Sequence, residues 1–443
     1  MSFIHKVKYA FTKNRPSDAK VGSLTSSFDI NLSLYKIKTH RWELKQIVNY
    51  LLMSTVISFV LVTNPASILA KIIVVLIFAI LCLLPITGQF FFNALPIFTW
   101  LSLYFTSSTF SASSRFPISV NILPAVETIL YGDDLSAILS NSQNMALDIL
   151  AWIPYGLFHF GAPFVVAIIL FLFGPPKILR SYAFAFGYMN LFGVIIQNLY
   201  PAAPPWYNDL YPDSIPNYSM KGSPGGLARI DKLLGINLYT SGFSNSSVIF
   251  GAFPSLHSGC ATMEALFFSY TFPQLRPIFV LYVFWLWWST MYLTHHYFID
   301  LVAGAMLSFS VFEYTKYNYY MPKILPDGKF HSRWSYGDIE YMHYNDCNPF
   351  AENPLDLESS AIQLNSFSKT NTVPITNTDE SNSNELEFDL DDLELTTKQE
   401  EENKQRYNFA IDTEEDLNKS KKKNNSNNCL LYTSPSPRDT ERS

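Results

Sequence analysis

Charged residues are scarce in this sequence, which is 15% Asp, Glu, Lys and Arg but 48% hydrophobic and 16% aromatic. A soluble globular domain carries about 25% charged residues. This shortfall excludes an ordinary soluble protein and favours one that lies in a membrane. The net charge of −6 says little about partners, because basic residues gather in the first 45 positions and most acidic ones follow Asp338. We expect no nucleic-acid partner.

The sequence also lacks a cysteine framework and a cleavable leader. About forty mostly polar residues precede the first apolar run, where a signal peptide would have a short apolar core and a small-residue cleavage site. We therefore expect the first membrane span itself to direct insertion. The spacing of the four cysteines fits neither zinc ligands nor a secreted disulfide scaffold, and we expect no zinc site and no disulfide from Cys82, Cys260, Cys347 and Cys429.

Long apolar runs, by contrast, are abundant. Crossing the hydrocarbon of a bilayer takes roughly 20 apolar residues in a helix, and eight runs come near that length, at about residues 46–63, 67–85, 89–106, 153–174, 181–200, 257–273, 278–294 and 300–318. The third is interrupted by Asn93 and Pro96 and the sixth carries Glu264, so either is a candidate for a partly re-entrant segment. The sequence predicts an all-α polytopic membrane protein, a bundle of about eight spans with six as the alternative.

Basic residues near the ends of the apolar runs predict how the spans are oriented. With eight spans, four groups of Lys and Arg fall on one side, which the positive-inside rule makes cytosolic. The groups are Lys36, Lys38, Arg41 and Lys45 before the first span, Lys177 and Arg180 after the fourth, Arg276 after the sixth, and Lys316 and Lys323 after the last. Both termini are then cytosolic, and residues 106–150, 201–256 and 294–298 lie on the opposite side.

These patterns divide the chain into three parts. Residues 1–45 form a basic cytosolic region, residues 46–320 a transmembrane domain with a long non-cytosolic loop at 201–256, and residues 321–443 a cytosolic tail. The tail is rich in Asn, Ser, Thr, Asp and Glu, a composition typical of disorder. Residues 430–443 differ from the rest of the tail and resemble a translated cloning remnant, so we assign them no function.

Two segments place ionisable residues where membrane proteins rarely keep them without a function. His257 starts the sixth apolar run and His296 precedes the eighth. Between them the chain crosses the membrane twice, so both lie on the same side at similar depth. Asp300 follows His296 by four residues, and on a helix this spacing lets the carboxylate accept a hydrogen bond from the imidazole. The other ring nitrogen is then a nucleophile or base, and His257 supplies a second ring for proton transfer.

The other histidines give weaker indications of function. A single histidine at a span end is more often a packing or interfacial residue, which is our interpretation of His295. For His159, inside the fourth run, packing and a role near the substrate are equally favoured. No cluster of Asp, Glu or Cys accompanies the histidines, so we expect no metal ion and no cofactor. The remaining four histidines are expected on the cytosolic side, away from the site: His5, His40, His331 and His343.

The residues around these histidines resemble a known superfamily. Pro254-Ser255-Leu256-His257-Ser258 and His296-x-x-x-Asp300 resemble the second and third signature motifs of the type 2 phosphatidic acid phosphatases. More narrowly, residues 188–197, 222–231 and 251–266 are similar to fungal inositol phosphorylceramide synthases. The resemblance covers about residues 40–325 and implies a phosphatidic acid phosphatase-like helical core, which makes the transmembrane domain the catalytic one.

The resemblance implies a role for each motif residue. His296 corresponds to the nucleophile that attacks phosphorus, and Asp300 to the carboxylate that orients it. His257 corresponds to the acid and base, and Ser255 to a phosphate contact.

One element of the superfamily pattern is missing, the cation that holds the phosphate. The third motif usually begins Ser-Arg, and the matching positions here are Ser289 and Thr290. The first motif has a spacing match that we interpret as chance, because it precedes every span: Lys8, Arg15 and Pro16. The charge that develops on phosphate needs a positive partner. Three basic residues of the 201–256 loop are candidates, with ordinary solvated charges as the alternative: Arg229, whose fork binds two phosphate oxygens, Lys221 and Lys232.

The implied activity is that of a lipid phosphotransferase. Phosphatidylinositol gives its phosphoinositol group to the primary hydroxyl of ceramide or phytoceramide through a phosphohistidine, and diacylglycerol is released. Two alternatives are a lipid phosphatase, in which water replaces the acceptor, and a transporter, which would spread polar residues along several spans. The expected partners are the two lipid substrates and membrane lipids, with a small regulatory membrane subunit left open. The expected location is the Golgi membrane, with the site facing the lumen.

Overall fold

The computed structural model describes residues 5–6, 24–40, 42–175, 177–318 and 321, and its regular elements are helices joined by turns. Within these residues, extended segments pair only as isolated bridges, Ser119 with Ala202 and Ala202 with Gly251. The predicted all-α class is therefore confirmed. Most of the predicted N-terminal region and C-terminal tail lies outside the described residues, as does the motif match at Lys8, Arg15 and Pro16.

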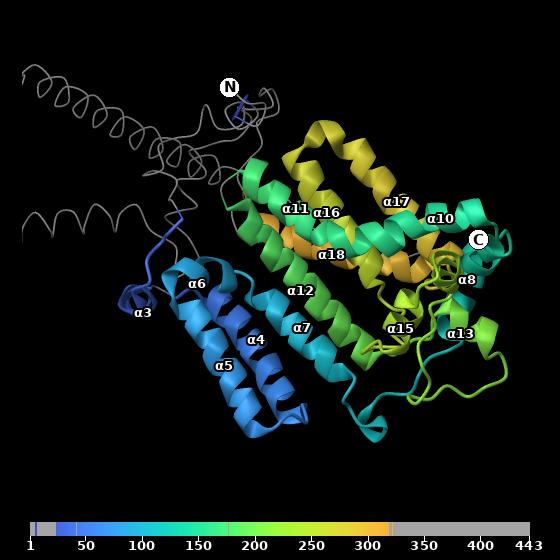
Figure 1. The fold of residues 1–443 in the computed structure, drawn as a ribbon, viewed down its shortest axis with the longest axis horizontal. Helices are drawn as coiled ribbons and strands as arrows, with labels where there is room; N and C mark the ends of the chain where they lie inside the picture. The colour runs from blue at the N-terminus through green and yellow to red at the C-terminus, as the bar shows by residue number, and fades with distance from the viewer. Residues whose placement is uncertain (1–4, 7–23, 41, 176, 319–320, 322–443) are drawn as a thin grey trace, which may run out of the picture. The chain divides into compact units, whose positions relative to one another are not determined.

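Each predicted apolar run falls on one or more helices (Figure 1). The helices of the runs are α4 (Leu44–Thr63), α5 (Ile68–Leu83), α6 (Pro85–Phe91), α7 (Leu95–Ser107), α10 (Met145–Trp152), the π-helical segment η2 (Ile153–Phe158), α11 (His159–Phe173), α12 (Ile178–Leu199), α16 (Leu256–Thr271), α17 (Arg276–Tyr292) and α18 (Phe298–Asn318).

Four of these helices are long and apolar enough to cross a membrane: α4, α12, α18 and the continuous helix Met145–Phe173. The pair α5 and α6 makes a fifth if its 106° bend lies within one span. The helices α7, α16 and α17 occupy three further predicted runs but have only 13, 16 and 17 residues. The chain is a multi-pass membrane protein, and the count of eight spans stays a prediction.

Prolines and caps set the ends of these helices. The break predicted in the third run lies between α6 and α7, where Pro96 sits in the first turn of α7. Proline fits there because its missing N–H would have no helical partner. The fourth helix begins eight residues earlier than the predicted residue 153, because the Asn144 side chain caps it by accepting the backbone N–H of Leu147.

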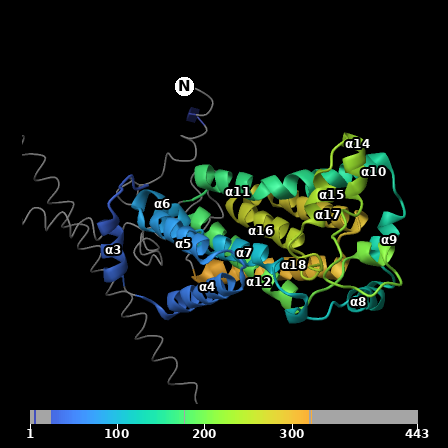
Figure 2. The same cartoon turned by 60° about the horizontal axis from the view of Figure 1, so that its bottom comes forward.

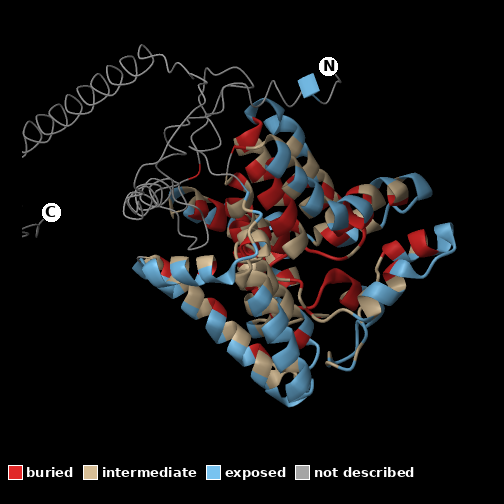
Figure 3. Cartoon of the chain, turned by 60° about the vertical axis from the view of Figure 1, so that its left-hand side comes forward, coloured by how far each residue is buried: buried red, intermediate tan, exposed pale blue. Residues whose placement is uncertain are grey.

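The centre of the bundle is α12, which packs against α7, α11, α16 and α18. In its most apolar 18 residues 72% are buried, against 17% for α4. Figure 3 shows buried residues concentrated where the central helices pass one another and exposed residues on the outer helices. Small residues allow the closest approaches: a Cβ on Gly304 of α18 would collide with the backbone carbonyl of Ser255 at the start of α16.

Short helices gather at one end of the long ones (Figure 2). They come from the two segments predicted on the non-cytosolic side. These segments contain η1 (Ala112–Ser114), α8 (Ile122–Tyr131), α9 (Leu135–Ser140), α13 (Pro205–Leu210), α14 (Leu227–Leu234) and α15 (Leu238–Ser244). The helix α8 contacts α18, α9 contacts α17 and α14 contacts α10. The two segments therefore fold onto the ends of the spans that carry His257 and His296.

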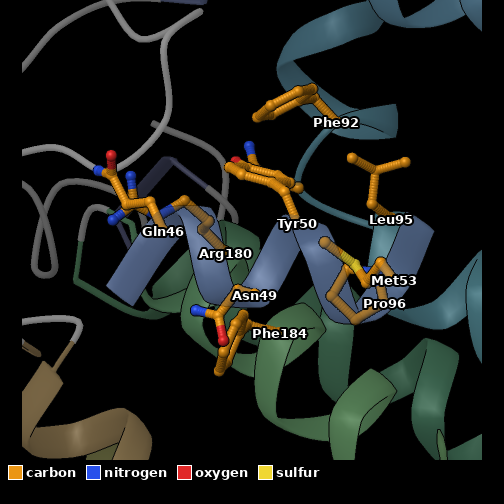
Figure 4. Close-up of a pocket in the computed structure, with 10 residues that line it drawn as sticks. Gln46, Asn49, Tyr50, Met53, Phe92, Leu95, Pro96, Arg180 and Phe184 are labelled. Carbon is orange, nitrogen blue, oxygen red and sulfur yellow. The ribbon is translucent and has the colours of Figure 1, made fainter. Parts of the chain in front are cut away.

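A small pocket lies at the opposite end of α12 (Figure 4). It is lined by α4 residues such as Gln46 and Asn49, by Asn93 and Pro96 near the start of α7, and by Arg180 of α12. Seventeen residues of helix separate Arg180 from Gln197 (197 − 180), which is about 26 Å at 1.5 Å per residue. Gln197 contacts the segment before His257, so this pocket is remote from the histidines.

Candidate active site

The start of α16 brings Ser255 and His257 to the end of α12. The Gln197 side-chain amide donates to the backbone carbonyls of Gly251 (2.9 Å) and Pro254 (3.1 Å), which holds the incoming segment. Ser255 then caps α16, its Oγ accepting from the backbone N–H of Ser258 at 3.3 Å. The backbone N–H of Ser255 donates to the Asp300 carbonyl oxygen at 3.0 Å. The two motif segments are therefore bonded to each other.

His296 and Asp300 are in contact, although not through the geometry that their spacing predicted. His296 Nδ1 lies 3.2 Å from Asp300 Oδ2, but α18 begins only at Phe298, so the two residues do not share a helical face. The buried Asp300 instead reaches back from the first turn of α18, and Oδ2 also accepts the backbone N–H of Tyr297 at 3.2 Å. One carboxylate thus caps the helix and orients the imidazole, which leaves Nε2 of His296 for chemistry.

His257 and His296 converge as the topology predicted, with ring centroids 5.3 Å apart. Two further side chains, both from the continuous helix Met145–Phe173, lie next to His257. The hydroxyl of Tyr155 lies 3.4 Å from His257 Nε2, and the ring of His159 lies 4.3 Å from the His257 ring. Sequence reasoning left His159 open between packing and function and did not single out Tyr155, since an aromatic residue in an apolar run carries no signal of its own.

The turn between α17 and α18 positions His296 and is held from several directions. Thr294 has a positive φ of 62°, a conformation that is uncommon for a residue other than glycine. Its carbonyl accepts the backbone N–H of Trp206 at 2.9 Å, and that of Leu293 accepts the N–H of Gly226 at 3.0 Å. Gly225 packs so closely here that a Cβ would collide with the Leu293 carbonyl oxygen. We call residues 293–297 the catalytic turn.

His295 is an anchor of the catalytic turn. Burial lowers its pKa to about 3, so the ring is neutral at physiological pH. Its Nε2 lies 2.9 Å from the carbonyl oxygen of Pro224 and, carrying the proton, donates to it. The structural role expected for His295 is therefore the one that its contacts support.

Glu127 is a buried acid that sequence reasoning missed. It lies in α8 with 0% of its surface exposed and accepts the backbone N–H of Phe298, at the start of α18. Burial, helped by the nearby charges of Asp134 and Asp300, raises its pKa to about 7 despite this hydrogen bond. The only sequence signal was a single carboxylate in an otherwise apolar ten-residue stretch.

Arg229 binds a carboxylate within the protein. Its Nε and Nη2 contact the carboxylate of Asp148 at 2.6 to 3.0 Å, and the same carboxylate accepts the Tyr292 hydroxyl at 2.8 Å. Burial lowers the pKa of Arg229, but hydrogen bonds and charge from Asp148 outweigh it and raise the pKa overall, so the guanidinium is charged. Lys221 and Lys232, the other two candidates, are exposed on the 201–256 connection.

Among the described residues, no group of three His, Cys, Asp or Glu side chains is arranged to hold a metal ion. The site therefore consists of two facing imidazoles, each with one oxygen partner, in a buried setting close to the ends of the spans.

Comparison with known proteins shows similarity over the part of the chain that contains this site. Residues 121–313 match the PAP2 superfamily, a range that begins at α8 and includes every site residue described above. The chain is 57% identical over 349 residues to the catalytic subunit of inositol phosphorylceramide synthase from Saccharomyces cerevisiae, covering 79% of this chain and 86% of that protein. It is 53% identical over 352 residues to the inositol phosphorylceramide synthase of Candida albicans, covering 80% and 74%.

A more distant similarity reaches into bacteria. The phosphoinositol dihydroceramide synthase of Bacteroides thetaiotaomicron is 29% identical over 170 residues, which cover 37% of this chain and 53% of that protein. No solved structure matches significantly. The identity to the two fungal proteins over most of their length, with the superfamily match across the histidine site, shows that the chain belongs to the fungal inositol phosphorylceramide synthases of the PAP2 superfamily.

Proposed function

We propose that this chain transfers phosphoinositol from phosphatidylinositol to the primary hydroxyl of ceramide or phytoceramide and releases diacylglycerol. The observation that carries the proposal is the facing pair of imidazoles, 5.3 Å apart, with Asp300 bonded to Nδ1 of His296. Two imidazoles this close together can both reach the same phosphodiester, where one attacks phosphorus and the other moves the proton.

The reaction proceeds in two displacements at phosphorus. In the first, Nε2 of His296 attacks, the bond from phosphorus to the diacylglycerol oxygen breaks, and His257 gives that oxygen a proton. In the second, His257 takes the proton of the ceramide hydroxyl, whose oxygen attacks phosphorus while the bond to His296 breaks. The enzyme returns to its starting protonation state, and each half uses the two histidines in reversed proton roles.

Phosphate binding involves Arg229 and Ser255 in this proposal. Arg229 uses Nε and Nη2 on Asp148, which leaves Nη1 for a phosphate oxygen. The space beside Gly226 is bounded by both Leu293 and Nη2 of Arg229, because a Cβ on Gly226 would collide with each of them. The guanidinium therefore lies beside the catalytic turn. Ser255 already accepts one hydrogen bond at Oγ and keeps its own proton for the phosphate. Lys221 and Lys232 are exposed and contribute at most a general attraction for the anionic head group.

The direct test is incubation of the purified protein in lipid vesicles with labelled phosphatidylinositol, with and without ceramide, followed by lipid separation. We expect labelled inositol phosphorylceramide that depends on ceramide. Release of labelled water-soluble phosphoinositol at the same rate without ceramide would indicate a phosphatase instead.

We further propose that the site faces the Golgi lumen and that both termini are cytosolic, since the basic groups near span ends fall on the side away from the histidines. With the native cysteines replaced, Asp213→Cys in the exposed 201–256 connection should resist an impermeant thiol reagent added to sealed Golgi vesicles. Thr39→Cys, on α3 (Ile30–Thr39), should react. The opposite labelling pattern would overturn the orientation.

The similar Saccharomyces cerevisiae protein is named a catalytic subunit, which supports a separate regulatory membrane subunit for this chain as well.

A further inference from the structure

The helix that runs from Met145 to Phe173 changes character beside the active site. Residues Ile153–Phe158 are π-helical, an arrangement that is rare and frequently found at functional sites. Pro154 lies in this segment and has no N–H to donate to the helix. The segment presents Tyr155, and four residues later His159, to the ring of His257.

A second tyrosine braces this π-helical segment. The hydroxyl of Tyr239, on α15, accepts the indole N–H of Trp152 at 2.6 Å and donates to the backbone carbonyl of Gly156 at 3.1 Å. Both bonded groups flank Tyr155 along the chain, so the position of Tyr155 is fixed from outside its own helix. Tyr239 belongs to the 201–256 connection, which thus supports both the catalytic turn and this segment.

In the part of the chain that the structure describes, the Tyr155 hydroxyl has one hydrogen-bond partner, which is His257. The side chain is 2% exposed, its hydroxyl oxygen lies 3.4 Å from His257 Nε2, and its ring centroid lies 4.8 Å from the His257 ring and 5.2 Å from that of His295. The other nitrogen of His257, Nδ1, has no partner among the described residues. A hydrogen bond to this buried hydroxyl occupies Nε2 of His257 and leaves Nδ1 as the nitrogen open to substrate.

We propose that Tyr155 is a positioning residue for the transfer reaction: its hydroxyl oxygen accepts the Nε2–H of His257 and reserves Nδ1 for the proton that moves to and from substrate. The proposal rests on the function proposed above. With Nε2 protonated in both states of the ring, Nδ1 gives its proton to the diacylglycerol oxygen in the first displacement. It then offers a lone pair to the ceramide hydroxyl in the second.

The two histidines would therefore be oriented by oxygens of different charge. Asp300 is a carboxylate on Nδ1 of His296, and a negative partner favours the positive charge that this ring gains when it attacks phosphorus. Tyr155 offers a neutral oxygen, which occupies Nε2 of His257 without holding the ring as a cation. That suits a group that must lose and regain a proton in each turnover.

Tyr155→Phe should slow transfer from phosphatidylinositol with little change in KM. Loss of one neutral hydrogen bond is worth about 0.5–1.5 kcal/mol, so we expect kcat to fall about 2- to 10-fold. The distinguishing substrate is a nitrophenyl ester of phosphoinositol, because nitrophenolate leaves without protonation. Rapid quenching should show that the variant forms phosphohistidine from this ester at the wild-type rate but from phosphatidylinositol more slowly.

Tyr182→Phe is the matched control. Tyr182 is 3% exposed in the same bundle, and its hydroxyl has no partner among the described residues, so its removal should leave both substrates unaffected. If Tyr155→Phe keeps the wild-type rate with phosphatidylinositol, or slows both substrates equally, the proposal is overturned. A failure of the proposed function would be seen in a different measurement, because the wild-type protein itself would then make no inositol phosphorylceramide.

A second variant covers the case in which Tyr155→Phe does not fold. Tyr239→Phe removes the brace and leaves Tyr155 in place, so it should give a smaller loss that is again confined to phosphatidylinositol. An equal loss with the nitrophenyl ester would show that the segment acts only through stability and would overturn the positioning role.

Discussion

The helices α5 and α12 are both apolar, yet they differ in what they bury. No residue of α5 is buried, and large side chains such as Leu76 and Ile77 are more than half exposed. Most of α12 is buried, including the polar Asn190 and Gln197. In hydrocarbon, polar groups are costly and stay where they have partners or a function. Buried polar side chains, rather than hydrophobicity, therefore distinguish α12 from α5.

The superfamily match also separates these two helices, because it begins at residue 121, includes α12, and leaves α5 outside together with α4, α6 and α7. Substitutions inside and outside the matched range should have effects of different kinds. Those at the described site residues of α8 and α18 and of the turn before α18 should change the chemistry or the pH dependence of stability, and those in α5 should change neither.

The largest effect is expected for His296→Ala. Removing the imidazole removes the nucleophile, so both the phosphohistidine and head-group transfer should disappear. The measurement is acid-labile label retained on protein after reaction with labelled phosphatidylinositol, alongside size-exclusion chromatography to show that the variant is folded. Label retained by the folded variant would mean that another residue attacks phosphorus.

Asp300→Asn should come next, with kcat lower by about 10²- to 10⁴-fold, by analogy with the loss of the orienting carboxylate in hydrolytic triads. The amide oxygen can still accept the backbone N–H of Tyr297, so the helix cap is retained. The neutral amide lacks the negative charge that favours the cationic imidazole of His296 when it attacks phosphorus. Steady-state transfer measured at saturating lipid tests this, and a loss of less than about tenfold would refute the orienting role.

Glu127→Gln should change how stability depends on pH. The pKa of Glu127 is about 7 in the folded protein and 4.5 ordinarily, so the unfolded chain loses this proton first as pH rises. Wild-type stability should therefore fall between pH of about 4.5 and 7, by on the order of 2 kcal/mol. The glutamine variant lacks this term while its oxygen still accepts the Phe298 N–H. The measurement is the thermal midpoint of each protein in detergent at pH 5 and at pH 8. The midpoint should fall more for wild type than for the variant between these two pH values, and an equal change in both proteins would contradict the assignment.

The smallest effect is expected in α5. Leu76→Ala, at a side chain 56% exposed, should leave thermal midpoint and kcat nearly unchanged, whereas Leu191→Ala in α12, at 0% exposure, should cost about 2–5 kcal/mol through the cavity it leaves. Equal destabilisation by the two variants would show that α5 is covered by protein, in an oligomer or by a partner subunit.

The sequence was informative where function follows from topology. His257 and His296 could be paired because two predicted crossings separate them, and Asp300 because it is four residues from His296. Contacts between segments remote in sequence could not be found this way. Arg229 and Asp148 are 81 residues apart, and Glu127 meets Phe298 across 171, so only the packing of α8, α10 and α14 against the spans brings them together.

The local backbone conformation around His296 could not be predicted from the residue spacing either. The i to i+4 spacing predicted a shared helical face, but the positive φ of Thr294 and the start of α18 at Phe298 place His296 in a turn. Backbone conformations of this kind depend on hydrogen bonds from other segments, which no local window contains.

The bonds to the catalytic turn also imply an order of assembly. The turn is held by Trp206, Pro224 and Gly226 from the 201–256 connection and, where α18 begins, by Glu127 from α8. Insertion of α17 and α18 therefore delivers His296 to the membrane without yet fixing its position. In the mechanism proposed above, His296 can attack phosphorus only once the two segments that precede it in the chain have folded against it, so we expect their docking to complete the site.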